Sequence, residues 1–173
     1  MVLGEKVILV MVVVVAVYTD IKYRKIYNIS TFAGTGAGLL LSVYAGGLHG
    51  LKVNLAGLVF GLALLMPIFY LGGVGGGDVK LLATVGAIGG YPFILWASSY
   101  MAVAGVFMAI ASLLRQGRLK KSAGRIGRFI RSLLFFVSVP AAGIYLPDNE
   151  GNISLPYGAA IGLGALAAIF LRF

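Results

Sequence analysis

An uninterrupted apolar run near the start of the chain decides the fold class. Residues 7–17 read VILVMVVVVAV, with no polar side chain among them. The whole chain is similar, because 60% of its 173 residues are hydrophobic and only 11% are charged, whereas soluble domains are typically about half apolar and a quarter charged. The mean hydropathy is +1.01. These values exclude a disordered chain and predict an all-α integral membrane protein.

Outward from this run, we expect six transmembrane helices in a single domain, residues 1–173. A spanning helix needs about 20 mostly apolar residues. Residues 132–145 are apolar but contain Pro140 and follow a strongly basic stretch, so an interfacial or re-entrant helix is expected there rather than a seventh span. Glycines recur in the second and last spans and predict close helix packing. The six expected spans are 1–18, 29–48, 53–71, 79–90, 91–114 and 156–171.

Missing residue types exclude several kinds of site. The chain has no cysteine, which excludes disulfides, thiolate metal sites and a cysteine nucleophile. Its single histidine, His49, excludes a His-cluster metal site, disfavours a Ser-His-Asp triad and is expected in a loop. We therefore expect neither a metal nor another cofactor.

The net charge of +9 is explained by membrane topology and needs no nucleic acid partner. Basic residues gather after the first span, at Lys22, Arg24 and Lys25, and in a long loop, 115–131, that holds seven of them. Loops rich in Lys and Arg stay cytoplasmic. With six spans, both termini then lie outside, and the basic loop lies inside, where it can contact anionic lipid. The expected location is the cell membrane, crossed several times.

Two aspartates fall on this cytoplasmic side, Asp20 after the first span and Asp78 before the short fourth span. Residues 72–77 read GGVGGG and cannot form a stable helix, since each glycine costs about 1 kcal/mol relative to alanine. Non-helical backbone at membrane depth is tolerated where it lines a cavity or is buried in protein. We therefore expect a water-accessible pocket that is open to the cytoplasm.

Two carboxylates in one pocket suggest an aspartyl protease, because like-charge repulsion keeps one protonated while the other is ionised and can activate water. One alternative is that each aspartate merely marks the boundary of a loop. A second is a proton-coupled small transporter or channel that uses the same carboxylates. That reading expects them near the middle of the membrane, with water reaching both faces.

Three motifs carry a family resemblance. Residues 75–80 read GGGDVK, a Gly-x-Gly-Asp-x-Lys motif, and residues 20–28 read DIKYRKIYN, similar to an Asp-x5-Ile-x-Asn signature. Residues 155–160 read LPYGAA and are similar to a Pro-Tyr/Phe-Gly start of a last span. Together they resemble the type IV prepilin peptidases, which are GxGD-type membrane aspartyl proteases. Since cysteine is absent, the chain resembles their short, peptidase-only branch, such as serves Flp-type pili.

The resemblance implies that Asp20 and Asp78 form a catalytic pair that removes the leader of membrane-inserted prepilins at the cytoplasmic membrane face. Gly75 and Gly77 match the motif glycines and would allow close approach of an extended substrate. Lys80 matches the motif lysine and would position the Asp78 carboxylate or the substrate, or anchor the helix at the interface.

Two further bases, Lys22 and Arg24, are candidates for contact with acidic positions of the substrate. The alternative for both is that they only anchor the topology, as Lys and Arg beside a span commonly do.

Overall fold

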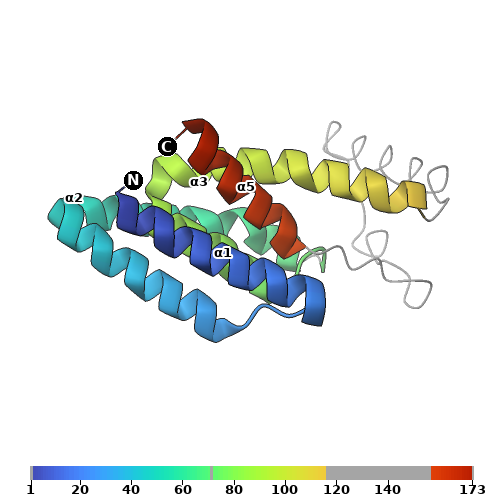
Figure 1. Cartoon of the computed structure of the whole chain (residues 1–173), viewed down its shortest axis with the longest axis horizontal. Coiled ribbons are helices and arrows are strands. Elements are labelled where there is room, and N and C mark those ends of the chain that lie inside the picture. The colour runs from blue at the N-terminus through green and yellow to red at the C-terminus, as the bar shows by residue number, and fades with distance from the viewer. Residues whose placement is uncertain (1, 71, 116–156, 173) are drawn as a thin grey trace. The chain divides into compact units, whose positions relative to one another are not determined.

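The computed structural model describes residues 2–70, 72–115 and 157–172, and these form helices without a strand among them. The all-α class expected from the sequence is confirmed. The chain divides into two compact units, one made of Met1–Gly105 and Pro156–Phe173, which contains both aspartates, and one made of Val106–Leu155, to which the end of α3 belongs. The helices, shown in Figure 1, are α1 (Leu3–Tyr23), α2 (Asn28–Tyr70), α3 (Gly76–Arg115) and α5 (Tyr157–Arg172).

Two of these helices are broken at a glycine. Gly47 interrupts α2 with φ 58° and ψ −143°, and Gly90 interrupts α3 with φ 78° and ψ 175°. Positive φ is readily available only to glycine, so these two positions tolerate the break without strain. The break in α3 frees backbone carbonyls, as any helix end does. The buried amide of Asn54 donates to two of them, at Ala87 (2.9 Å) and Ile88 (3.2 Å).

The first part of α3 is the centre of this unit, since every residue from 81 to 88 is buried. The first part of α2 runs alongside it in the same direction, because Gly34 packs on Thr84 and Gly38 on Ile88. The second part of α2 runs the opposite way.

Two backbone contacts show that the second part of α2 runs opposite to the first part of α3. Gly57 meets Gly86 backbone to backbone, and a Cβ on Gly61 would lie 2.7 Å from the carbonyl oxygen of Leu82. The chain therefore doubles back at Gly47, as Figure 1 shows.

Helix α1 packs on both α2 and α5. Along α5, Gly162 lies against Val13 and Val17, and Gly158 lies against Asp20, so α1 and α5 are antiparallel. Small residues thus allow the close packing that the sequence predicts. The prediction is confirmed for the glycines that contact another helix and is wrong for Gly36, which has nothing within 4 Å. The confirmed glycines are Gly34, Gly38, Gly158, Gly162 and Gly164.

The structure does not support six separate membrane helices. Two described helices are long and apolar enough to cross a membrane, α2 and the part of α3 from Gly76 to Ser112. Helix α5 has only 16 residues, fewer than the roughly 20 that a span needs. The count differs because single glycines, rather than loops, separate the two parts of α2 and of α3. The expectations for the basic loop, 115–131, and the interfacial helix, 132–145, fall almost wholly outside the described residues.

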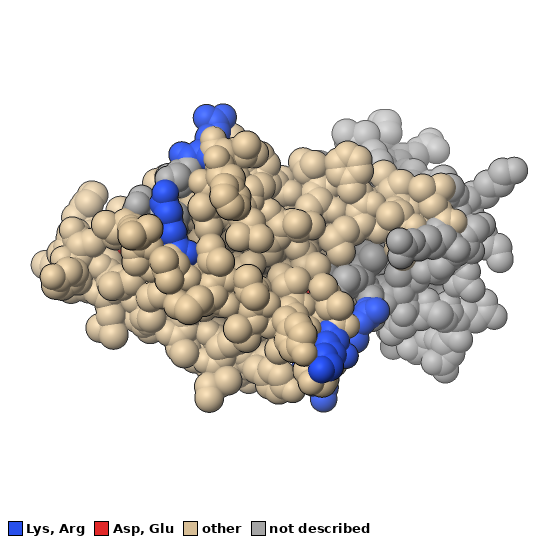
Figure 2. Space-filling model, in the orientation of Figure 1, with Lys and Arg blue, Asp and Glu red and all other residues tan. Residues whose placement is uncertain are grey.

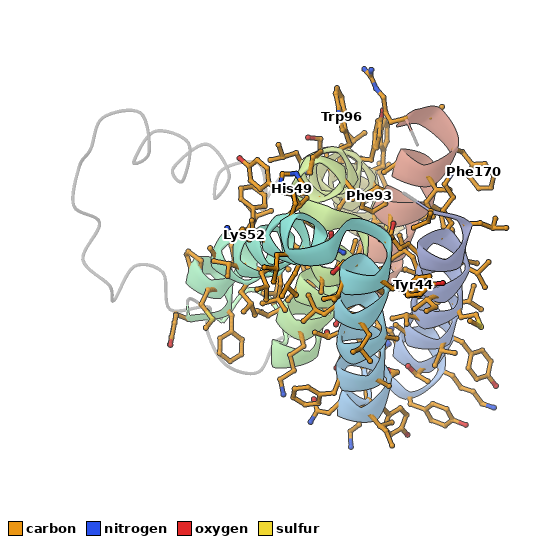
Figure 3. The ribbon with its side chains drawn as sticks, turned by 90° about the vertical axis from the view of Figure 1, so that its left-hand side faces the viewer. Tyr44, His49, Lys52, Phe93, Trp96 and Phe170 are labelled. Carbon is orange, nitrogen blue, oxygen red and sulfur yellow. The ribbon has the colours of Figure 1, made fainter. Side chains whose placement is uncertain are left out.

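The surface of this unit is largely apolar. Tyr44, Phe170 and Ile29 are each at least 80% exposed, and Figure 2 shows Lys and Arg gathered at two separate places with uncharged surface between them. Figure 3 shows Phe170 at the edge of the ribbon, and Tyr44 and His49 are exposed residues of α2. The expectation that His49 lies in a loop is wrong, because it is an exposed residue of helix α2. Apolar exposure on this scale marks a surface for lipid or for a partner.

Candidate active site

Asp20 lies in the last turn of α1 and is 8% exposed. Its carboxyl group sits against the first residues of α5, where a Cβ on Gly158 would lie 2.7 Å from Asp20 Oδ2 and 3.1 Å from its Cγ. The backbone N–H groups of Gly158 and Ala159 donate to this carboxyl group, and the Arg24 guanidinium adds a favourable charge nearby. The start of a helix stabilises negative charge in the same way. Asp20 Oδ2 is buried and accepts no hydrogen bond from the described residues.

Asp78 lies in the first turn of α3 and is 9% exposed. The Gly75 carbonyl accepts hydrogen bonds from the N–H groups of Asp78 (3.1 Å) and Val79 (3.3 Å), so Gly75 is the N-cap of the helix. In return, the Gly75 N–H donates to Asp78 Oδ2 at 3.1 Å. This is half of a capping box. It uses one carboxylate oxygen only, because Asp78 Oδ1 is buried and has no hydrogen-bond partner within the described part of the chain.

The fold brings the two aspartates together, although 58 positions separate them in the sequence. They are near enough for the charge of Asp20 to act on Asp78, and the Tyr157 phenol is near enough to feel the charge of Asp78. Each carboxylate keeps one oxygen for other groups. A buried oxygen without a hydrogen bond is costly, so the two free oxygens, Asp20 Oδ2 and Asp78 Oδ1, are suited to bind a water or a polar group of a substrate.

The predicted supporting residues lie around the pair in different ways. Gly75 caps the helix that carries Asp78, and a Cβ on Gly77 would lie 3.0 Å from Ile26 Cβ. The Lys80 amino group does not turn to Asp78 but donates to Asn28 Oδ1 at 2.9 Å and lies over the Phe32 ring, 5.7 Å from its centroid.

The two candidate substrate contacts, Lys22 and Arg24, are both exposed residues at the end of α1. Lys22 donates to Tyr18 Oη at 3.0 Å and lies over the rings of Tyr18 and Tyr23. Arg24 is the C-cap of α1, with φ 54°, and its backbone N–H donates to the Asp20 carbonyl. Lys22 is thus held at the end of α1 by aromatic side chains, and the Arg24 guanidinium is near enough for its charge to act on the Asp20 carboxyl group.

Two contributors to the site, Gly158 and Tyr157, were not predicted from the sequence. Both belong to the LPYGAA stretch, residues 155–160, which served only as a family motif and was given no role in the site. The signal for Gly158 was present in the sequence as a glycine at the start of an apolar segment, but its contact with Asp20 depends on how α5 docks on α1. No three metal-ligating side chains lie together within residues 2–70, 72–115 and 157–172.

The fold and the site define a class of protein: small, apolar and helical, with two buried carboxyl groups near each other. A comparison with protein families assigns it further, since the model of the type IV leader peptidase family matches residues 7–113. The matched range contains both aspartates and the motifs around them. No curated protein and no solved structure matches the chain. The chain belongs to the type IV leader peptidase family, and so to a family of proteases.

Proposed function

We propose that this protein is a membrane aspartyl endopeptidase that removes the leader peptide of type IV, Flp-like prepilins at the cytoplasmic face of the membrane. The observation that supports the proposal best is the aspartate pair itself. Asp20 from α1 and Asp78 from α3 are both buried, and each has an oxygen that no described group occupies. Family membership supplies the substrate class, since leader peptidases of type IV act on prepilins.

The chemistry follows from two carboxylates that share one proton. The ionised aspartate takes a proton from a water molecule while the water oxygen bonds to the carbonyl carbon of the scissile peptide. The protonated aspartate donates toward the oxygen on which negative charge develops. The C–N bond then breaks, and the amine leaves with a proton that the pair returns. Because the two groups titrate as a unit, neither role is assigned to one aspartate.

In the proposed membrane arrangement, α2 and α3 each cross twice, with reversals at Gly47 and Gly90, and α1 crosses once. Helix α5, whose 16 residues are fewer than in a usual span, crosses antiparallel to α1. Gly90 divides α3 unevenly. Residues 76–89 make about 21 Å of helix at 1.5 Å per residue, less than the hydrocarbon core of about 30 Å, so Asp78 at the start of this arm would lie below the cytoplasmic membrane surface. The end that carries the aspartates also carries Lys22, Lys25 and Lys80, and more bases follow α3 in the sequence. The positive-inside rule then puts this end in the cytoplasm and both termini outside.

The alternative of a proton-coupled transporter fits the site less well. A proton relay needs carboxylates near the middle of the membrane with access from both faces. Asp20 is in the last turn of α1 and Asp78 is in the first turn of α3, so in the proposed arrangement both lie on one side of the membrane rather than near its middle. Glu5, at the opposite end of α1, is occupied by a hydrogen bond from the Val2 N–H (2.9 Å).

A cleavage assay tests the proposal. Purified protein in detergent is incubated with a prepilin, a short protein with a glycine before a hydrophobic helix, and loss of the leader is followed on a gel. Asp20→Asn and Asp78→Asn should each abolish cleavage, while Glu5→Gln, a buried carboxylate away from the pair, should retain it. Cleavage by either Asn variant at the wild-type rate would falsify the dyad, and inhibition by a chelator would indicate a metal instead.

A further inference from the structure

The segment that links α1 to α2, residues 24–28, touches the start of α3 at two points, one on each side of Asp78 in the sequence. On one side, Ile26 packs on Gly77, where a Cβ would lie 3.0 Å from Ile26 Cβ. On the other side, Lys80 Nζ donates to Asn28 Oδ1 at 2.9 Å. Two separate sequence motifs are therefore in direct contact, and their contacts bracket a carboxylate of the proposed active site.

The other aspartate is attached to the same segment. Asp20 lies in the last turn of α1, and its backbone carbonyl accepts a hydrogen bond from the Arg24 N–H (2.9 Å) where the helix ends. Only residues 24–27 separate α1 from α2, and Asn28 is the first residue of α2. The Tyr27 carbonyl accepts from Ser30 Oγ (2.8 Å), which holds the end of the loop to the first turn of α2. Asp20, Ile26 and Asn28 thus form one short, connected piece.

We propose that Ile26, Asn28 and Lys80 are positioning residues, which hold the first turn of α3 at two points so that Asp78 is kept in place relative to Asp20. This inference rests on the proposed aspartyl endopeptidase function. None of the three residues touches the reacting atoms. Their effect on the reaction passes through the separation and orientation of the two carboxyl groups.

The Lys80–Asn28 bond is suited to this role more than to stabilising the fold. Both side chains are exposed, and even an exposed ion pair adds only about 0–1 kcal/mol to stability, whereas in this bond only Lys80 is charged. The contact with the Phe32 ring restricts the Lys80 side chain further. Deeper in the same interface, Thr84 bonds to Thr35 Oγ1 (3.0 Å), so the helices remain joined when the outer contact is lost.

A double-mutant cycle tests the assignment, with kcat and KM for prepilin cleavage measured on Asn28→Leu, Lys80→Met and the double variant. Loss of position should lower kcat about 10-fold or more in each single variant with KM within about twofold, because a misplacement of about 1 Å can cost 100-fold. The kcat of the double variant should be no more than about threefold below the lower of the two single-variant kcat values, since both changes break the same hydrogen bond. Asn28→Asp keeps the acceptor oxygen and should recover most of the kcat that Asn28→Leu loses.

A matched control removes a hydrogen bond from the same interface away from the aspartates. Thr35→Val loses the bond to Thr84 and should leave kcat within about twofold of wild type. Thermal unfolding in the same detergent checks that each variant is folded, and Asn28→Ala replaces Asn28→Leu if the latter does not accumulate.

Three results would overturn the assignment of Ile26, Asn28 and Lys80 as positioning residues. They are losses of kcat in Asn28→Leu and Lys80→Met that multiply in the double variant, a change confined to KM, or a wild-type kcat in Asn28→Leu. The first two would identify Lys80 as a direct contact of the substrate or of Asp78. Asp20→Asn and Asp78→Asn are measured in the same series. If these two aspartate variants still cleave, the proposed function is wrong. If they are inactive and the losses in the double-mutant cycle are additive, only the assignment of the positioning residues is wrong.

Discussion

Replacing Gly158 with alanine should strongly reduce kcat while leaving the protein folded. The new Cβ would lie 2.7 Å from Asp20 Oδ2 and 3.1 Å from its Cβ and Cγ. Carbon and oxygen atoms in ordinary contact are about 3.5–4.0 Å apart, so the carboxyl group must move by roughly 0.5–1 Å. It can do so by rotating its own side chain, because the atoms that collide with the new methyl group belong to a side chain rather than to backbone.

The expected loss follows from this displacement. A misplacement of about 1 Å in a reacting group can cost about 100-fold in rate, which corresponds to roughly 2.7 kcal/mol in the activation free energy. KM should change little, because Gly158, in the first turn of α5, would meet Asp20 and the change therefore acts through the position of that carboxyl group. Stability should also change little, since alanine favours a helix over glycine by about 1 kcal/mol and offsets part of the strain.

The assay is the prepilin cleavage reaction, with thermal unfolding followed by circular dichroism on the same samples. Gly36→Ala is the matched control, because Gly36 is an exposed helical glycine with nothing within 4 Å, and it should keep the wild-type kcat. A folded Gly158→Ala variant with wild-type kcat would refute the reasoning, since it would show that the carboxyl group need not stay against the start of α5.

Three further predictions concern the fold and its orientation. Gly86→Ala should destabilise the protein by more than about 3 kcal/mol, because the new Cβ would overlap the Gly57 backbone. Overpacking typically costs about 1–3 kcal/mol even where only side chains must move. A thermal unfolding transition within about 1 °C of wild type would contradict this prediction. Asn54→Leu should cost about 1–3 kcal/mol, because two buried α3 carbonyls lose their donor; an unchanged denaturation midpoint would speak against the cap. In a chain without native cysteine, Cys at Lys25 should be labelled from the cytoplasm and Cys at Lys52 from outside, and the reverse pattern would overturn the orientation.

The aspartate pair could be identified from the sequence because its chemistry is local to two short motifs. A glycine-rich stretch followed by an acid at the start of an apolar segment indicates a buried carboxylate. The expectation that residues 72–77 are non-helical is correct only as far as Gly75, because α3 begins at Gly76. The partner motif lies at the end of the first apolar run. The pairing of Asp20 with Asp78 followed from placing both on one side of the membrane, and the structure brings these residues together.

The supporting contacts could not be predicted in the same way, because they depend on how distant segments dock. Lys80 and Asn28 are 52 positions apart, and a lysine at a helix end has several equally good uses until its neighbours are known. The contact between Gly158 and Asp20 likewise depends on the packing of α5. The number of separate helices was wrong because a glycine with positive φ can reverse a helix without a loop, as Gly47 does, and apolar content does not reveal this.

The most direct test of the aspartyl mechanism is the cleavage rate of Asp20→Asn, Asp78→Asn and the double variant, measured in single turnover on one prepilin. When two carboxylates act as a unit, the effects of replacing them are not additive. The double variant should therefore cleave no more slowly than either single variant. We expect both single variants to lose at least about 1,000-fold, as removal of a member of a catalytic pair commonly does. A single variant that stays within tenfold of wild type, or losses that multiply in the double variant, would contradict an active site built from Asp20 and Asp78.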